Sequence, residues 1–143
     1  MTVADHLKYL TASSLAFWQN LKQQHWGTYG PQFITHHEFF GSYADVVYAQ
    51  IDPLAERLRM LGEDVPLNLT PFNLIDAITT RETPTEMLEC ALRCASYFCE
   101  GMKEAIEAAE KVGDYGTVDL LSKSIQDHQK SEWFLKMMLK STT

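Results

Sequence analysis

The sequence contains no long apolar run. Its 143 residues are 45% hydrophobic, yet uninterrupted apolar stretches are only a few residues long, far short of the roughly 20 that cross a bilayer. The first six residues, Met1 to His6, also lack the basic and apolar regions of a signal peptide. The sequence therefore predicts a single soluble, cytoplasmic domain over residues 1–143, with no membrane partner.

Cysteine is scarce, and the three cysteines that are present, Cys90, Cys94 and Cys99, fall within one expected helix. An odd number in a single stretch is not the pattern of a disulfide framework. We expect reduced thiols that pack as small hydrophobic side chains. A metal pair formed by Cys90 and Cys94 is the alternative, but the sequence shows no third ligand beside it.

Positive charge is in deficit, with 12 Lys and Arg against 19 Asp and Glu and a formal net charge of −7. Affinity for nucleic acid comes mostly from basic side chains that displace counterions from phosphates. The first expected helix begins almost at Met1, and the C-terminal end carries little beyond Lys136 and Lys140. We expect little or no direct DNA binding at physiological salt, and a cationic ligand fits the composition better.

Apolar residues recur at helical spacing in four stretches, and none alternates as a strand would. The expected helices cover residues 3–26, residues from 33 until Gly62, residues 83–112 and residues 114–140. Proline interrupts the connection over residues 63–83, where we expect a crossover with one short helix. Two helices, a long connection and two more helices are the connectivity of an all-α, ferritin-like four-helix bundle.

Two pairs of possible metal ligands lie on the first two expected helices. His25 ends the first helix and His37 lies near the start of the second, so an antiparallel hairpin brings their imidazoles to neighbouring levels. Asp52 and Glu56 stand four residues apart, which places both carboxylates on one face of the second helix.

The two pairs are too far apart to meet within one subunit. His37 and Asp52 are fifteen residues apart on one helix, or about 22 Å. If two copies pair antiparallel about a twofold axis near Ala44 and Asp45, His37 of one copy meets Asp52 of the other. An isologous dimer of this kind makes two equivalent sites.

Mixed imidazole and carboxylate ligands suit iron, and the absence of thiolate argues against a closed structural zinc site. Zinc or cobalt are alternative occupants, because affinity order alone does not select iron. Without any metal, a lone helical histidine is usually a surface or hydrogen-bonded residue. Asp52 and Glu56 are then a solvated face or partners of Arg57 and Arg59.

Further residues at fixed spacing extend this pattern through most of the chain. They are His25-Trp26, Gly30-Pro31, Phe33, His37, Phe40, Tyr43, Asp52, Ala55-Glu56-Arg57, Leu61-Gly62, Gly113-Asp114, Thr117, Asp119-Leu120-Leu121 and Trp133. The set resembles the Dps family, the mini-ferritins named for DNA protection in starved cells. A multi-residue match at fixed spacing is far more specific than a short motif.

The resemblance implies a hollow dodecamer that oxidises Fe(II) at twofold interfaces, favours hydrogen peroxide as oxidant and stores ferric mineral in its cavity. Such a protein protects against oxidative damage, because Fe(II) is consumed without feeding hydroxyl radical formation. The resemblance assigns the ferroxidase role to His25 and His37 of one subunit and to Asp52 and Glu56 of its neighbour. Trp26 is expected either to intercept stray oxidising equivalents or to pack at the interface.

The resemblance also gives roles to other acidic residues. Asp114 and Asp119 match positions that line threefold pores for Fe(II), and Glu38 and Asp45 match the inner wall where mineral nucleates. Helix capping is a second explanation for Asp114. The nucleating wall is expected to be weak, because Gly41 and the residue after it stand where we expect more acid.

Three features depart from the family pattern. Pro53 removes one backbone hydrogen bond inside the second expected helix and tends to kink it next to Asp52. His36 beside His37 leaves two possible registers, and the spacing to the other ligands favours His37. Family members that condense DNA are thought to use mobile Lys-rich termini, which this sequence lacks.

Three other interpretations are open. An ordinary ferritin with an intrasubunit di-iron centre normally carries Glu-x-x-His pairs, and the sequence has none. An architectural, DNA-protecting or host-interaction shell would have the same fold with a vestigial metal site. A plain helical adaptor would be a monomer.

Overall fold

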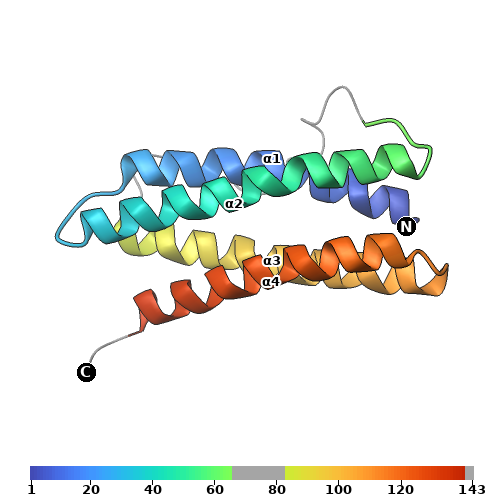
Figure 1. The fold of residues 1–143 in the computed structure, drawn as a ribbon. Helices are drawn as coiled ribbons and strands as arrows, with labels where there is room; N and C mark the ends of the chain where they lie inside the picture. The colour runs from blue at the N-terminus through green and yellow to red at the C-terminus, as the bar shows by residue number, and fades with distance from the viewer. Residues whose placement is uncertain (66–82, 141–143) are drawn as a thin grey trace.

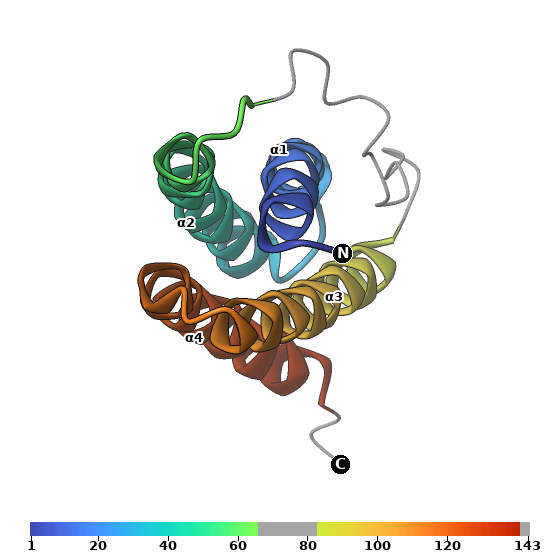
Figure 2. The same cartoon turned by 90° about the vertical axis from the view of Figure 1, so that its right-hand side faces the viewer.

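Four helices make up the regular structure in residues 1–65 and 83–140, the ranges that the computed structural model describes. In chain order they are α1 (Val3–Gly27), α2 (Phe33–Met60), α3 (Pro84–Lys111) and α4 (Tyr115–Leu139). Helices α1 and α2 form one antiparallel hairpin, and α3 and α4 form a second that packs against it (Figures 1 and 2). The predicted all-α bundle is confirmed, with helix ends within two residues of those expected. The predicted crossover helix falls in a segment that lies mostly outside the described residues.

Capping residues determine where the helices begin. Thr2 and Thr83 precede α1 and α3, and each hydroxyl accepts a hydrogen bond from the N–H three residues later. Asp5 and Glu86 complete two capping boxes, because their carboxylates accept the N–H of the capping threonine. Gly113 joins α3 to α4 at φ +71°, a conformation that glycine adopts without steric penalty.

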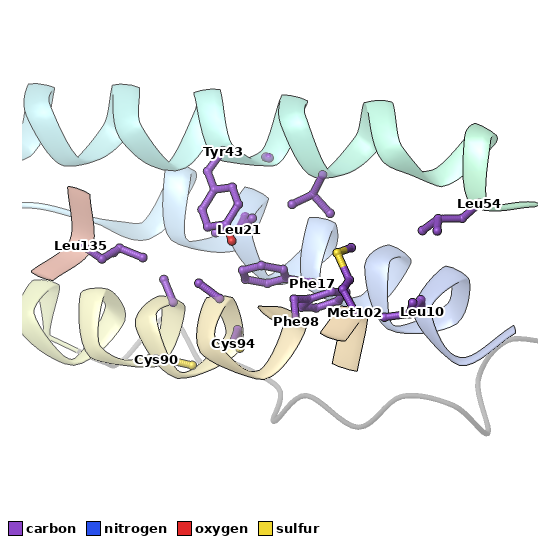
Figure 3. Close-up of a cluster of buried hydrophobic side chains, with 14 of the residues drawn as sticks. Leu10, Phe17, Leu21, Tyr43, Leu54, Cys90, Cys94, Phe98, Met102 and Leu135 are labelled. Atoms are coloured by element: carbon purple, nitrogen blue, oxygen red, sulfur yellow. The ribbon is translucent and has the colours of Figure 1, made fainter. Parts of the chain in front are cut away.

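The apolar stripes of all four helices meet in one core (Figure 3). Phe17 of α1 stacks on Phe98 of α3 at 5.2 Å between ring centroids, and Tyr43 of α2 meets Phe17 edge-on at 5.2 Å. Such aromatic pairs add stability beyond the area that they bury. No helix within the described residues is long and apolar enough to cross a membrane.

Helix α2 continues across Pro53 as one element of 28 residues. Proline removes one hydrogen bond of the helix ladder. Leu54 and Leu58, one and five residues later, are fully buried in the core. Their packing against the other helices opposes a break at Pro53. Asp52 and Glu56 therefore stay on the same helix as His37.

Two of the three cysteines, Cys90 and Cys94, are buried in the core as predicted. Cys99 is only half-buried. Burial raises the pKa of its thiol to about 11, and a thiol that stays protonated at neutral pH is a poor nucleophile and metal ligand.

Candidate metal centre

The structure brings His25 and His37 together where α1 turns into α2. Their imidazole rings stack with centroids 3.8 Å apart and planes 15° from parallel. Nδ1 of His25 lies 2.6 Å from the backbone carbonyl oxygen of His37, and Nδ1 of His37 lies 2.6 Å from the carbonyl oxygen of His25. The predicted meeting of the two imidazoles is therefore confirmed as a reciprocal pair.

These two hydrogen bonds fix the position of one proton on each ring. A carbonyl oxygen only accepts, so each Nδ1 carries the proton and donates it. In the neutral rings of His25 and His37 each Nε2 then keeps its lone pair. This is the tautomer of a metal-binding histidine whose other nitrogen is anchored to the backbone.

Two neighbours hold the pair in place. The ring of Phe33 stacks on His37 at 4.9 Å with an angle of 21°. On the other side, a Cβ at Gly41 would lie 2.8 Å from Cε1 and 2.9 Å from Nδ1 of His25, closer than real Cβ contacts. The His25 ring therefore occupies the space of a side chain at position 41, which explains why no acidic residue stands there.

Asp52 and Glu56 are exposed, one turn apart, on the second half of α2. The arginines that we considered as their partners bind other residues. Arg57 pairs with Asp114 at 2.7 Å, and Arg59 pairs with Asp64. The two carboxylates thus form no ion pair with either arginine.

One subunit does not assemble a complete centre from these residues. Within residues 1–65 and 83–140, no group of three or more His, Cys, Asp and Glu side chains is arranged to hold a metal. The histidine pair lies at the start of α2, whereas Asp52 and Glu56 lie in its second half. Each pair offers only part of a coordination shell.

The remaining predicted site residues differ in exposure. Trp26 is 68% exposed beside His25, with the Lys22 ammonium 5.7 Å from its ring centroid. Glu38 and Asp45 are exposed on α2. Asp119 is exposed on α4 and pairs with Lys123 at 3.2 Å, a contact of the kind that contributes little stability at a surface.

Asp114 forms a helix cap and an ion pair. It caps α4 by accepting from the Thr117 N–H at 3.2 Å, and it accepts from Arg57 at 2.7 Å. Burial alone would raise the pKa of Asp114, but the hydrogen bonds from Thr117 and Arg57 outweigh burial and hold that pKa below its usual value. The capping explanation is confirmed, and the pore role of Asp114 and Asp119 stays a prediction.

The structure also contains a polar cluster that the sequence did not lead us to expect. Tyr43, Gln50 and His128 are buried between α2 and α4 and hydrogen-bond one another. A sequence signal for His128 existed, because it stands midway between the core residues Leu121 and Leu135 at seven-residue intervals. That spacing places it on the buried face of α4.

Comparisons with known proteins agree with this architecture. A family model described as a ferritin-like domain matches residues 4–143. The crystal structure of Dps from Thermosynechococcus elongatus is similar to this chain with a TM-score of 0.93 and 33% identity, over 97% of this chain and 90% of that one. This chain belongs to the Dps family. Its fold is thus that of a ferritin-like protein.

Three further proteins are similar to this chain. General stress protein 20U of Bacillus subtilis is 30% identical over 123 residues, covering 83% of this chain and 84% of that protein. The fine tangled pili major subunit of Haemophilus ducreyi is 32% identical over 127 residues, covering 83% of this chain and 65% of that protein. Dps from Vibrio cholerae O1, described as a ferritin-like diiron-carboxylate protein, has a TM-score of 0.90 and 26% identity, over 96% of this chain and 89% of that one. Membership of this family supports iron storage as the general role.

Proposed function

We propose that this Dps-family protein oxidises Fe(II) with hydrogen peroxide at sites shared between two subunits. The observation that carries the proposal is the reciprocal histidine pair, which leaves Nε2 of His25 and His37 available to a cation. Asp52 and Glu56 supply the carboxylates from the partner. Imidazole and carboxylate together form a ligand set that suits iron.

The exposed surface of α2 supports pairing of two subunits. Asp45, Tyr48, Asp52 and Glu56 follow one another at helical spacing and are all exposed, with Tyr48 at 60%. Ile34 near the start of the same helix is 63% exposed. Burial of these large apolar side chains against a second copy is favourable, and an antiparallel arrangement carries Asp52 towards the partner's histidine pair.

The proposed chemistry needs little from the protein besides positioning. One peroxide molecule accepts two electrons, one from each of two Fe(II) ions, and water then completes a ferric oxyhydroxide with release of protons. Holding the ions beside the site where peroxide enters makes the two one-electron steps coincide. Hydroxyl radical is then not released, and Trp26 beside His25 would intercept any oxidising equivalent that escapes.

We further propose that twelve subunits enclose a cavity in which the ferric mineral collects, with protection against oxidative damage as the result. Asp119 is the better candidate for the threefold pore, because Asp114 is held by Arg57 and Thr117, whereas the pair of Asp119 with Lys123 is exposed to solvent. Glu38 and Asp45 are candidates for nucleation. The net charge of −7 favours iron over DNA as ligand, and we propose a cytoplasmic location.

The decisive experiment loads the purified protein with Fe(II) without oxygen, adds peroxide and follows ferric absorbance. Wild type should oxidise iron rapidly, and a variant with His37→Ala and Asp52→Ala should not. Glu110→Ala, which removes an exposed carboxylate from α3, should behave as wild type. Equal, slow oxidation in wild type and the double variant would favour an architectural shell.

Mixed assemblies test the shared site itself. Subunits with His37→Ala and subunits with Asp52→Ala are each inactive, but a mixed dimer contains one site with both lesions and one intact site. Random mixing should therefore restore about a quarter of the wild-type sites, as expected for an isologous interface. Failure of the mixture to recover activity, with intact assembly by sedimentation, would contradict the shared site.

A further inference from the structure

A hydrogen-bonded tyrosine and histidine lie inside the bundle, away from the proposed iron ligands. The hydroxyl of Tyr43 on α2 is 2.7 Å from Nδ1 of His128 on α4. Nε2 of His128 is 2.9 Å from Oε1 of Gln50. His128 is fully buried and Tyr43 is 2% exposed; Figure 3 shows Tyr43 within the core cluster. The proposed iron chemistry uses none of these three side chains.

The outer contacts of Gln50 locate the protons that join Gln50, His128 and Tyr43. The Gln50 amide nitrogen donates to the carbonyl oxygen of Ser124 at 3.3 Å and to the carboxylate of Asp127 at 3.2 Å. Both of these groups only accept, so Oε1 of Gln50 faces His128 and accepts from Nε2–H. Nδ1 of His128 is then the free base, and Tyr43 donates its phenolic proton to it.

We propose that Tyr43 and His128 form a redox pair in which Tyr43 gives up one electron and passes its proton to Nδ1 of His128. Loss of an electron turns a phenol into a strong acid, and a buried cation radical is costly. The base is already within hydrogen-bond distance, so the proton moves as the electron leaves. The products are a neutral tyrosyl radical and a protonated His128.

The surroundings suit both states of His128. In the resting state burial lowers its pKa to about 4, so it is neutral and able to accept a proton. Once protonated, its Nε2–H still donates to Gln50 and its Nδ1–H donates to the Tyr43 oxygen. The Asp127 carboxylate, which binds the Gln50 amide, adds negative charge behind that acceptor. No polar atom of the pair loses its partner in either state.

A chain of aromatic rings connects the pair to the surface. Trp133, 57% exposed on α4, lies 5.1 Å from the ring of Phe134. Phe134 lies 6.3 Å from Phe39, and Phe39 lies 5.9 Å from Tyr43. His37 of the candidate metal centre is six residues before Tyr43 on α2, or about 9 Å along the helix. Electrons can thus leave Tyr43 towards a surface indole or towards the iron site.

The oxidation of Tyr43 balances with hydroxyl radical as the oxidant. Iron and peroxide as the source of that radical are the one part of this proposal that rests on the proposed function. When one Fe(II) meets peroxide alone, the products are Fe(III), hydroxide and hydroxyl radical. Because Tyr43 is buried, the radical takes its electron through Trp133 and the rings between them and becomes hydroxide, while the Tyr43 proton moves to His128. A second Fe(II) later returns the electron, His128 returns the proton, and the resting pair is restored. The pair therefore stores one oxidising equivalent until a second Fe(II) arrives.

The first test uses the metal-free protein, so that it does not depend on iron chemistry. Azide radicals made by pulse radiolysis oxidise tryptophan, and we expect the tryptophanyl absorption to decay as tyrosyl absorption grows. Tyr43→Phe should lose most of the tyrosyl signal. Tyr115→Phe, which removes an exposed tyrosine from α4, should keep it. An unchanged tyrosyl yield in Tyr43→Phe would overturn the proposal.

A second measurement needs no variant. Protein labelled with ¹⁵N-histidine is oxidised, frozen and studied by electron–nuclear double resonance. A tyrosyl radical hydrogen-bonded to His128 should show a coupling to a histidine nitrogen and to an exchangeable proton. Their absence from the tyrosyl signal would contradict transfer to His128.

A third arm adds peroxide to protein holding one Fe(II) per site and looks for the same radical signal. Its appearance in wild type and loss in Tyr43→Phe would connect the pair to iron oxidation. If the azide arm gives the radical and the iron arm does not, the connection of the pair to iron oxidation fails and the redox pair stands. If the azide arm gives no Tyr43 radical, the pair itself is wrong.

Discussion

Two histidine sites in this protein differ in what their ring nitrogens contact. At the α1–α2 turn, His25 and His37 use Nδ1 on backbone carbonyls and leave Nε2 free. In the core, both ring nitrogens of His128 bind side chains, Tyr43 and Gln50. The free nitrogen decides the chemistry, because a metal needs an unshared lone pair, whereas a proton relay needs a partner on each side.

Replacement of one histidine at each site should give the largest difference between the two sites. His25→Leu should weaken Fe(II) binding by more than about 100-fold, since loss of a second-shell partner alone costs 10 to 100-fold, and should leave thermal stability nearly unchanged. His128→Leu should leave Fe(II) binding intact but cost about 1–3 kcal/mol, because the buried groups of Tyr43 and Gln50 lose their partner. Anaerobic Fe(II) titration and denaturant unfolding measure the two quantities. Equal losses of affinity in both variants would remove the distinction.

Acid should lower the free energy of unfolding through His128. Burial lowers the pKa of His128 from 6.5 to about 4, so the unfolded chain binds this proton more readily than the folded one. Its contribution to stability is complete above pH 6.5 and is lost as pH falls towards 4, by about 3 kcal/mol at 1.36 kcal/mol per pKa unit. Denaturant unfolding from pH 7 to 4 should show a steeper loss in wild type than in His128→Leu. Parallel pH curves would show that another group controls acid unfolding.

Gly41→Ala should disturb the pair of His25 and His37 and leave His128 and its partners unchanged. The new Cβ would meet the His25 ring at 2.8 Å, and the displaced ring should weaken Fe(II) binding by roughly 10 to 100-fold. The α2 helix itself should not suffer, since alanine favours helix over glycine by up to about 1 kcal/mol. Gly101→Ala is the matched control, because its Cβ would meet Leu10 at an ordinary 3.5 Å. Unaltered Fe(II) binding in Gly41→Ala would show that the His25 ring relocates freely.

The smallest expected difference between the two sites comes from the phenylalanine that stacks on a histidine in each. Phe33 stacks on His37 at 4.9 Å, and Phe98 stacks on His128 at 5.0 Å. Phe33→Leu should weaken Fe(II) binding by up to about tenfold, from a stacking energy of about 0.5–1.5 kcal/mol. Phe98→Leu should lower the unfolding free energy by a similar amount and leave Fe(II) binding unchanged. The opposite pattern would place the functional histidine in the core.

The four helices and the site residues were predicted with different success. Apolar periodicity, with Gly62 as the end of the second helix, placed every helix end within two residues. The spacing argument also brought His25 and His37 together correctly. It did not anticipate that each ring would bind the other's carbonyl, nor that Arg57 would bind Asp114 and leave Asp52 and Glu56 exposed.

The sequence by itself determined the all-helical bundle, the Dps family and where the two pairs of candidate ligands lie on the helices, because a helix repeats over a few residues and its faces follow from that period. Only the tertiary structure decided which nitrogens are free. The contacts that do so join residues 12 positions apart for His25 and His37, and 78 and 85 apart for His128 with Gln50 and Tyr43. Partners this distant are set by how the helices pack against one another, which no local pattern encodes.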